Sequence, residues 1–415
     1  MSSVSWHSEY AVQMCRYFLR PIGLWVTNEN SWREKFFNKL LTVSTFSLLL
    51  FLLIPCALHT FLEEPNIAVR MKLIGPMSFA VMAIIKYSSL TRLTKRLEKC
   101  FKSVEEDWKS SDSAERKVLH RQAKIGRLLS IFSALLMYSG SFIFYHVIMP
   151  VAAVQTFSAN LEVAHDSLDI NGSSSATNEK KLRILTFPTY EAWVNLDDEI
   201  AYQFVYLMQC LSGFVMDTIT VGTCSLAAVF VTHTCAQLEI VVEMSRNYVD
   251  SRKNDKTPKT SAERLTVLVK KHCRALKFAT QIKDYLNGIC FVEFIGCTAN
   301  ICFVGYYCLT EWERKEPISM VTYFILVISF TLNIFIFCFI GEHLAEHCKQ
   351  LDSVYMNIDW YKLPGKEVVD LLMIIAVSRR PVKLMAGSFA DLTLITFSSV
   401  MKTAFTYFNL LRTII

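Results

Sequence analysis

The last twenty residues combine an apolar composition with a row of polar side chains at helical spacing. On a helix, at about 100° per residue, one side would carry Ser398, Lys402, Thr406, Asn409 and Thr413. A polar row on a membrane helix costs free energy unless it meets water or protein partners. The row is typical of a helix that lines an aqueous pore, but it equally suits hydrogen bonding between packed helices.

Four ionisable residues lie inside otherwise apolar segments. Two are basic, Lys86 and Lys402, and two are acidic, Asp217 and Glu293. Mutual pairing is the simpler expectation, because a charge in the membrane usually finds a partner. The alternative is that these groups face a water-filled vestibule. The sequence leaves open which residue pairs with which.

A short motif, His343-Leu344-Ala345-Glu346-His347, matches the H-x-x-E-H pattern of a class of zinc proteases. Zinc chemistry would need a third ligand and a water-lined cleft. The motif follows an apolar segment, where His and Glu are ordinary polar surface. No glycine loop for phosphate, carboxylate pair or Ser-His-Asp arrangement stands out. We therefore predict no metal ion, no cofactor and no enzymatic activity.

The composition predicts an integral membrane protein. Of 415 residues, 52% are hydrophobic and 19% are charged, against about 25% charged in soluble domains. This balance excludes a soluble enzyme and a disordered protein. A net charge of +6 is also too small for a nucleic-acid binder, so no nucleic-acid partner is expected.

Seven segments are long and apolar enough to be transmembrane helices, which need about 20 residues with few charges. We therefore predict an all-α membrane protein in which residues 1–415 form a single seven-helix domain. The spans are placed at 40–62, 73–91, 128–158, 200–232, 280–310, 318–341 and 386–412. The last one carries the polar row.

Basic residues in the connecting loops predict the orientation. One alternate set of loops holds 31 Lys and Arg, and the other set holds six. This asymmetry places the N-terminus in the cytosol and the C-terminus outside, opposite to a G-protein-coupled receptor. The one Asn-X-Ser/Thr triplet begins at Asn171 and falls in a loop assigned to the outside, so we predict glycosylation there.

The cytosolic loops are long and partly helical in pattern. Leu93, Leu97, Phe101 and Val104 recur at helical spacing, so the second span should continue as a helix beyond the membrane. We predict a cytosolic helical layer built from 92–127, 233–277 and 342–383.

The last 80 residues carry a series of short motifs, which cover about a fifth of the chain. They are Cys338-Phe339-Ile340-Gly341-Glu342, Tyr355, Trp360-Tyr361, Arg380-Pro381, Gly387, Phe389, Phe397, Met401-Lys402-Thr403, Thr406-Tyr407-Phe408 and Leu411-Arg412. In these motifs the sequence resembles the insect odorant receptors. The chain resembles a variable tuning subunit. The region after its fourth span lacks the long insertion of the shared co-receptor.

The resemblance implies a ligand-gated, non-selective cation channel. Its members assemble as tetramers, and a tuning subunit joins the co-receptor as a hetero-oligomer, with the seventh helix of each subunit lining the pore. Matching the chain ends places the hydrophobic gate at Leu410 and Ile414 and a polar constriction at Thr413. Lys402, Thr406 and Asn409 complete the expected pore lining.

The same resemblance implies a pocket for a small volatile ligand in the outer halves of the second, third, fourth and sixth spans. Large apolar side chains with a few polar tips suit such a ligand, although each of them could instead face lipid or pack in the core. The candidates are Met77, Val81, Phe142, Tyr145, His146, Tyr202, Met208, Leu211, Tyr323, Phe324 and Val327.

The expected location is the plasma membrane, in contact with lipid, and the resemblance implies the dendrite of an olfactory neuron. Three alternatives remain open: a gustatory receptor of the same superfamily, a receptor that signals through a G protein, and a membrane metalloenzyme that uses His343 and His347.

Overall fold

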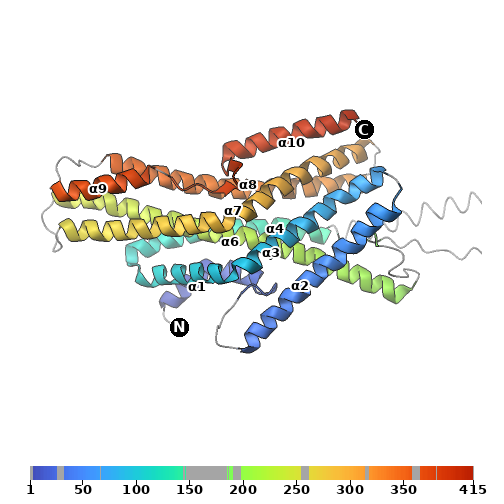
Figure 1. The fold of residues 1–415 in the computed structure, drawn as a ribbon, viewed down its shortest axis with the longest axis horizontal. Helices are drawn as coiled ribbons and strands as arrows, with labels where there is room; N and C mark the ends of the chain where they lie inside the picture. The colour runs from blue at the N-terminus through green and yellow to red at the C-terminus, as the bar shows by residue number, and fades with distance from the viewer. Residues whose placement is uncertain are drawn as a thin grey trace, which may run out of the picture.

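The chain folds into an elongated bundle of long helices that run along one axis (Figure 1). The computed structural model describes residues 3–25, 32–65, 67–143, 145, 185, 187–189, 198–253, 261–313, 317–357, 365–379 and 381–414. The elements are α1 Ser3–Leu19, α2 Trp32–Leu58, the π-helix η1 His59–Glu63, α3 Ile67–Ser110, α4 Ser113–Ile143, α6 Glu199–Lys253, α7 Ser261–Glu313, α8 Pro317–Met356, α9 Gly365–Ser378, β1 Met385–Ala386, β2 Ala390–Asp391 and α10 Leu394–Ile414.

Six of the described helices are long and apolar enough to cross a membrane. They are α2 together with η1, α3, α4, α6, α7 and α8. This set confirms a multi-pass, helical membrane protein. The predicted seventh span contains α10, which is not among these six helices, so a count of seven remains a prediction.

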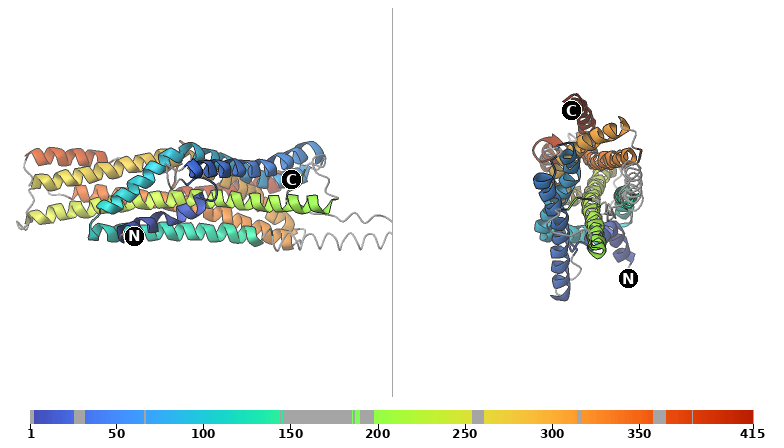
Figure 2. Two further views of the ribbon diagram at one scale, coloured as in Figure 1. Left: turned by 90° about the horizontal axis from the view of Figure 1, so that it is seen from below. Right: turned by 90° about the vertical axis from the view of Figure 1, so that its right-hand side faces the viewer.

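Helix α6 forms the centre of the bundle, with the other long helices around it (Figure 2). Its apolar window is 83% buried, whereas the windows of the other five candidate spans are 17–44% buried. The sequence accounts for this position, because small residues such as Cys224, Ala227 and Ala228 let neighbouring helices approach closely. Gly126 of α4 lies directly against Thr232 of α6.

Several helices continue well past the length needed to cross a bilayer. The expected continuation beyond Thr91 is helical as far as Ser110, and that beyond Gly341 is helical as far as Met356. These extensions lie beside the start of α7, the end of α6 and α9 at one end of the bundle (Figure 1). The assignment of that end to the cytosol stays a prediction.

The predicted helical span 386–412 is wrong at its beginning. Strands β1 and β2 pair there as an antiparallel hairpin, with Met385 opposite Asp391, and α10 begins only at Leu394. Gly387 makes the turn with a φ of 63°, a left-handed conformation that favours glycine over other residues. Apolar composition alone did not separate so short a hairpin from a helix.

The hairpin fixes the start of α10 to the rest of the bundle. The N–H of Gly387 donates to the carbonyl of Asn287 at 3.4 Å, and the rings of Phe291 and Phe389 stack with centroids 5.5 Å apart. A Cβ added to Gly341 of α8 would collide with the Leu392 carbonyl oxygen. Gly341 therefore lets the segment just before α10 approach α8 closely.

Candidate functional site

Helix α10 packs on α7 and α8 through its apolar side. Val400 and Ala404 are 5% and 3% exposed. The ring of Phe397 meets Phe335 of α8 edge to face at 5.4 Å, and the thiol of Cys302 on α7 lies 3.8 Å from the Ala404 carbonyl oxygen. These contacts set which side of α10 faces the bundle.

The polar row of α10 faces away from that contact. Ser398, Lys402, Thr406 and Asn409 are exposed, and Leu410 at the rim of the row is 51% exposed. The Thr406 hydroxyl donates to the Lys402 carbonyl at 2.9 Å, so it is satisfied within its own helix. The side chains of Thr413 and Ile414 lie outside the described residues. The described part of the row therefore does not pack inside the chain's own bundle.

A groove of about 680 Å³ separates α10 from α7 over part of its length. Its walls are largely apolar, so an apolar groove runs beside the helix that carries the polar row. The lining comprises Phe294, Ile295, Thr298, Ala299, Cys302, Phe303, Ala390, Thr396, Ser399, Val400, Thr403, Tyr407 and Leu410.

A buried ion pair lies at the centre of the bundle. Lys86 Nζ of α3 is 2.9 Å from Glu293 Oε2 of α7, and both side chains are almost fully buried. The ammonium also donates to Thr220 of α6 at 2.9 Å, and Asn333 of α8 donates to the Glu293 carboxylate. One polar cluster thus joins four helices, which confirms mutual pairing for these two charges.

The remaining two ionisable residues have different surroundings. Asp217 is 3% exposed and accepts a hydrogen bond from the Ser141 hydroxyl of α4. At the next residue of α6, the Thr218 hydroxyl is hydrogen-bonded to the Tyr138 hydroxyl at 2.9 Å. Lys402 is exposed on α10. The sequence singled out all four ionisable residues, but only Lys86 and Glu293 form a pair with each other.

The predicted ligand contacts divide between inward and outward positions. Tyr145 is buried and lies against Gly213 of α6. Partly buried positions, where contact with a ligand between helices is possible, are occupied by Met77, Tyr202, Met208, Tyr323 and Val327. Exposed positions on the outer surface of the single chain are occupied by Val81, Phe142, Leu211 and Phe324. His146 lies outside the described residues.

One inward polar group was missed by the sequence reasoning. Tyr307 of α7 is 3% exposed, and its hydroxyl has no hydrogen-bond partner among the described residues. Its ring lies 5.9 Å from that of Tyr323. A buried hydroxyl without a partner costs free energy, so this position has an unused donor beside a predicted ligand contact. The sequence reasoning missed Tyr307 because α7 is not among the helices that the resemblance implies for the pocket.

A pair of hydrogen bonds joins the N-terminal part of α6 to the connection between α4 and α6. The Gln209 side chain accepts from the Phe187 N–H at 3.2 Å and donates to the Phe187 carbonyl at 2.8 Å. Phe187 is 6% exposed, and it belongs to the connection between α4 and α6. The Gln209 amide therefore holds the Phe187 ring on the bundle. The sequence did not indicate this contact, because the two residues lie far apart along the chain.

The fold and its buried polar centre define a many-helix membrane protein. The profile of the family described as 7tm Odorant receptor matches residues 66–405. The chain therefore belongs to this family of insect odorant receptors, which are receptors and not enzymes. This membership confirms the resemblance seen in the C-terminal residues and extends it over most of the chain.

Individual odorant receptors are similar to this chain at low sequence identity. Putative odorant receptor 92a of Drosophila melanogaster is 24% identical over 81% of this chain and 76% of its own length. Odorant receptor 13a of the same species is 23% identical over 52% of this chain. That match spans about half of the relative's length, 54%. Odorant receptor 67c is 24% identical over 43% of this chain and 46% of its own length.

Solved structures share the fold. The insect olfactory receptor OR5 from Machilis hrabei superposes with a TM-score of 0.72 at 14% identity, covering 97% of this chain and 99% of that one. The same receptor in complex with eugenol superposes with a TM-score of 0.69, covering 99% and 98%. At this identity the likeness concerns the fold alone.

Proposed function

We propose that this chain is an odorant receptor subunit of a ligand-gated, non-selective cation channel, and that α10 lines the pore. The observation that carries the proposal is the division of α10 into two sides. Val400 and Ala404 lie on the buried, apolar side, while Lys402, Thr406 and Asn409 lie on the exposed, polar side. In a bilayer, an exposed polar side is stable only against water or polar protein surface.

One copy of α10 cannot enclose a pore, so the proposal requires other subunits. The exposed rows of several copies arranged around an axis would surround a water-filled path. We propose a tetramer formed with the odorant receptor co-receptor, in which Leu410 and Ile414 form the hydrophobic gate and Thr413 the polar constriction. Seven spans and a cytosolic N-terminus complete the proposal, supported by the loop charges of 31 against six.

We propose a small volatile molecule as the ligand, held between the outer halves of α3, α4, α6 and α8. A structure of OR5 with eugenol supports a small organic ligand by analogy of fold. The inward positions Met77, Tyr145, Tyr323 and Val327 are the stronger candidates. The unused hydroxyl of Tyr307 beside Tyr323 would offer a ligand a polar handle.

Helix α8 provides the physical link between the two proposed sites. It carries Tyr323 toward its outer end and, three turns further on, Phe335, which contacts Phe397 of α10. A ligand that binds more tightly when α8 has shifted would favour the α10 position that goes with that shift, because ligands act through differential affinity.

The location follows from the same reasoning. We propose a plasma-membrane protein, placed in the dendrite of an olfactory neuron. Asn171 would then lie outside the cell and carry a glycan, although this residue lies outside the described part of the chain. An epitope tag on the N-terminus that stays inaccessible in intact cells would support this orientation, and accessibility would favour a G-protein-type receptor instead.

The test is current evoked by volatile compounds in cells that express this chain with the co-receptor. A panel of alcohols, esters, aldehydes and phenols, eugenol among them, would be applied to these cells and to control cells that express the co-receptor alone. We expect compounds that evoke cation current only when both chains are present. Responses that require G-protein signalling would contradict the proposal.

A further inference from the structure

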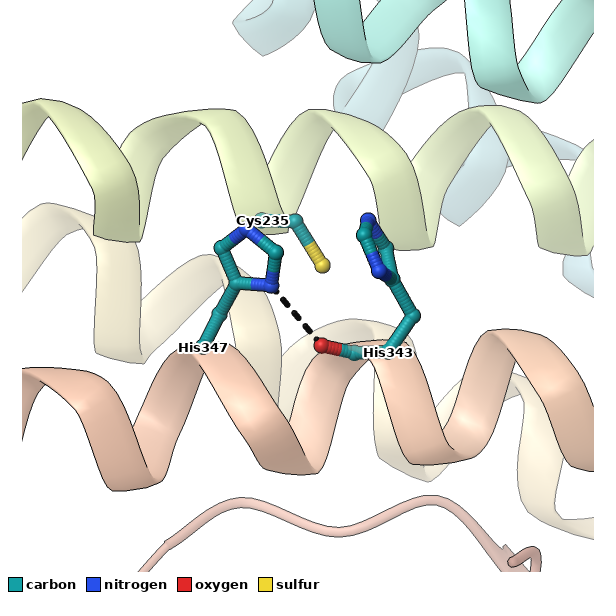
Figure 3. Close-up of side chains that lie close together, drawn as sticks. All are labelled: Cys235, His343 and His347. Carbon is teal, nitrogen blue, oxygen red and sulfur yellow. Dashed lines mark hydrogen bonds between the residues drawn. The ribbon is translucent and has the colours of Figure 1, made fainter. Parts of the chain in front are cut away.

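The C-terminal half of α8 faces α6 through a group of metal-ligating side chains that the proposed channel does not use. Cys235 of α6, His343 of α8 and His347 of α8 each offer one ligand atom, and these atoms lie within 4.8 Å of one another. The sulfur of Cys235 lies between the two imidazole rings (Figure 3). The H-x-x-E-H spacing places both histidines on one face of α8, and α6 contributes the third ligand that the motif lacked.

Hydrogen bonds already orient both rings. His347 Nδ1 lies 2.9 Å from the His343 carbonyl oxygen, so it carries a proton and leaves the lone pair on Nε2. That nitrogen is 3.2 Å from Gln122 Nε2 of α4, a donor that an ion would replace. His343 Nε2 lies 2.9 Å from Gln122 Oε1, an acceptor, so the lone pair of that ring is on Nδ1. Histidines that bind metal ions commonly donate their other N–H in this way to an oxygen.

The surroundings suit a partly buried site with three protein ligands. Cys235 is completely buried, while both histidines are partly exposed and leave a way in for an ion. Gln122 Nε2 also donates to Glu239 at 3.1 Å, so the amide keeps a partner when an ion takes its place at His347. One thiolate with two imidazoles is a ligand set that Zn²⁺ accepts in tetrahedral geometry, with a fourth position for water or an amide oxygen.

We propose that Cys235, His343 and His347 bind one Zn²⁺ ion, which joins α6 to α8. This inference departs from the expectation of no metal site, which rested in part on the missing third ligand. Zn–S and Zn–N distances of about 2.3 and 2.1 Å require the three side chains to close in by small rotations. The proposal does not depend on whether the chain is a channel.

The experiment uses the full-length chain purified in detergent, stripped with a chelator and titrated with Zn²⁺ and separately with Co²⁺. We expect one Zn²⁺ ion per chain. With Co²⁺ we expect a near-ultraviolet charge-transfer band from the thiolate and the visible bands of a tetrahedral site. The variant Cys235→Ser should lose the charge-transfer band. His343→Gln and His347→Gln each remove a ligand and should weaken Zn²⁺ binding by more than the roughly 10–100-fold typical of losing an outer-shell partner.

Controls separate this site from the other twelve thiols and from surface histidines. Cys290→Ser on α7 and His59→Gln on η1 should bind Zn²⁺ as the original chain does. If the variants at the site fail to fold, the Co²⁺ spectrum of the unchanged chain still decides the matter. A folded chain without a thiolate band, or equal binding by folded variants, would overturn the proposal and leave a hydrogen-bonded cluster only.

Discussion

Replacing Lys86 by Met should strongly destabilise the bundle, because the change leaves the Glu293 carboxylate buried without its counter-charge. The ammonium and carboxylate are 2.9 Å apart, and Lys86 is completely buried. Removing one member of a buried pair costs about 3–5 kcal/mol. At ~2 °C per kcal/mol for a large domain, the melting temperature should fall by about 6–10 °C.

The double variant Lys86→Met with Glu293→Gln should recover most of this loss. It removes both charges, and the amide oxygen that replaces the carboxylate would still accept from Asn333, which donates to that side chain in the original chain. Replacing both members of a buried pair is often nearly neutral. The two single changes should therefore be strongly non-additive, as expected for groups in direct contact.

The assay is thermal unfolding of the detergent-purified chain, followed by size-exclusion chromatography of the remaining folded protein. Lys95→Met provides the matched control, because Lys95 is an exposed lysine of the same helix and should cost no more than about 0.5 kcal/mol. If Lys86→Met costs no more than this control, or if the double variant is as unstable as the sum of the single ones, the reasoning about the buried pair is wrong.

Three further predictions concern the proposed pore, the proposed pocket and the hairpin. Lys402→Glu reverses a charge on the exposed side of α10, and it should change the reversal potential or single-channel conductance; normal surface expression with unchanged currents would count against a pore position. Tyr145→Ala and Tyr323→Ala should each shift the odorant concentration for half-maximal current while assembly is retained, and dose-response curves equal to the original for both would remove them from the pocket. Gly341→Ala should destabilise the chain by about 1–3 kcal/mol through overpacking, because its Cβ would meet the Leu392 carbonyl oxygen; an unchanged melting temperature would mean that the hairpin can move away at little cost.

The sequence predicted the features that depend on local pattern. The long helices follow from apolar composition, and the two sides of α10 follow from helical spacing, so Val400 is buried and Lys402 is exposed as the spacing requires. The continuation of α3 to Ser110 also follows from periodicity. Each of these is decided by neighbours within a few turns.

Features that depend on packing between distant segments could not be predicted. The pairing of Lys86 with Glu293 and the approach of Cys235 to His343 depend on which helices are neighbours and on their relative rotation. The same limitation accounts for the exposure of Phe324 and Val81, because choosing the inward side of a wholly apolar helix needs its orientation in the bundle.

The central claim, that water reaches the polar side of α10, can be tested by thiol modification during current recording. Thr406→Cys lies on the exposed side, and Ala404→Cys lies on the buried side of the same helix. A charged, membrane-impermeant thiol reagent applied with an activating odorant should change the current through channels containing Thr406→Cys within seconds. It should leave those with Ala404→Cys, and the original chain with its thirteen cysteines, unaffected. Equal insensitivity of all three would contradict a water-filled path along α10.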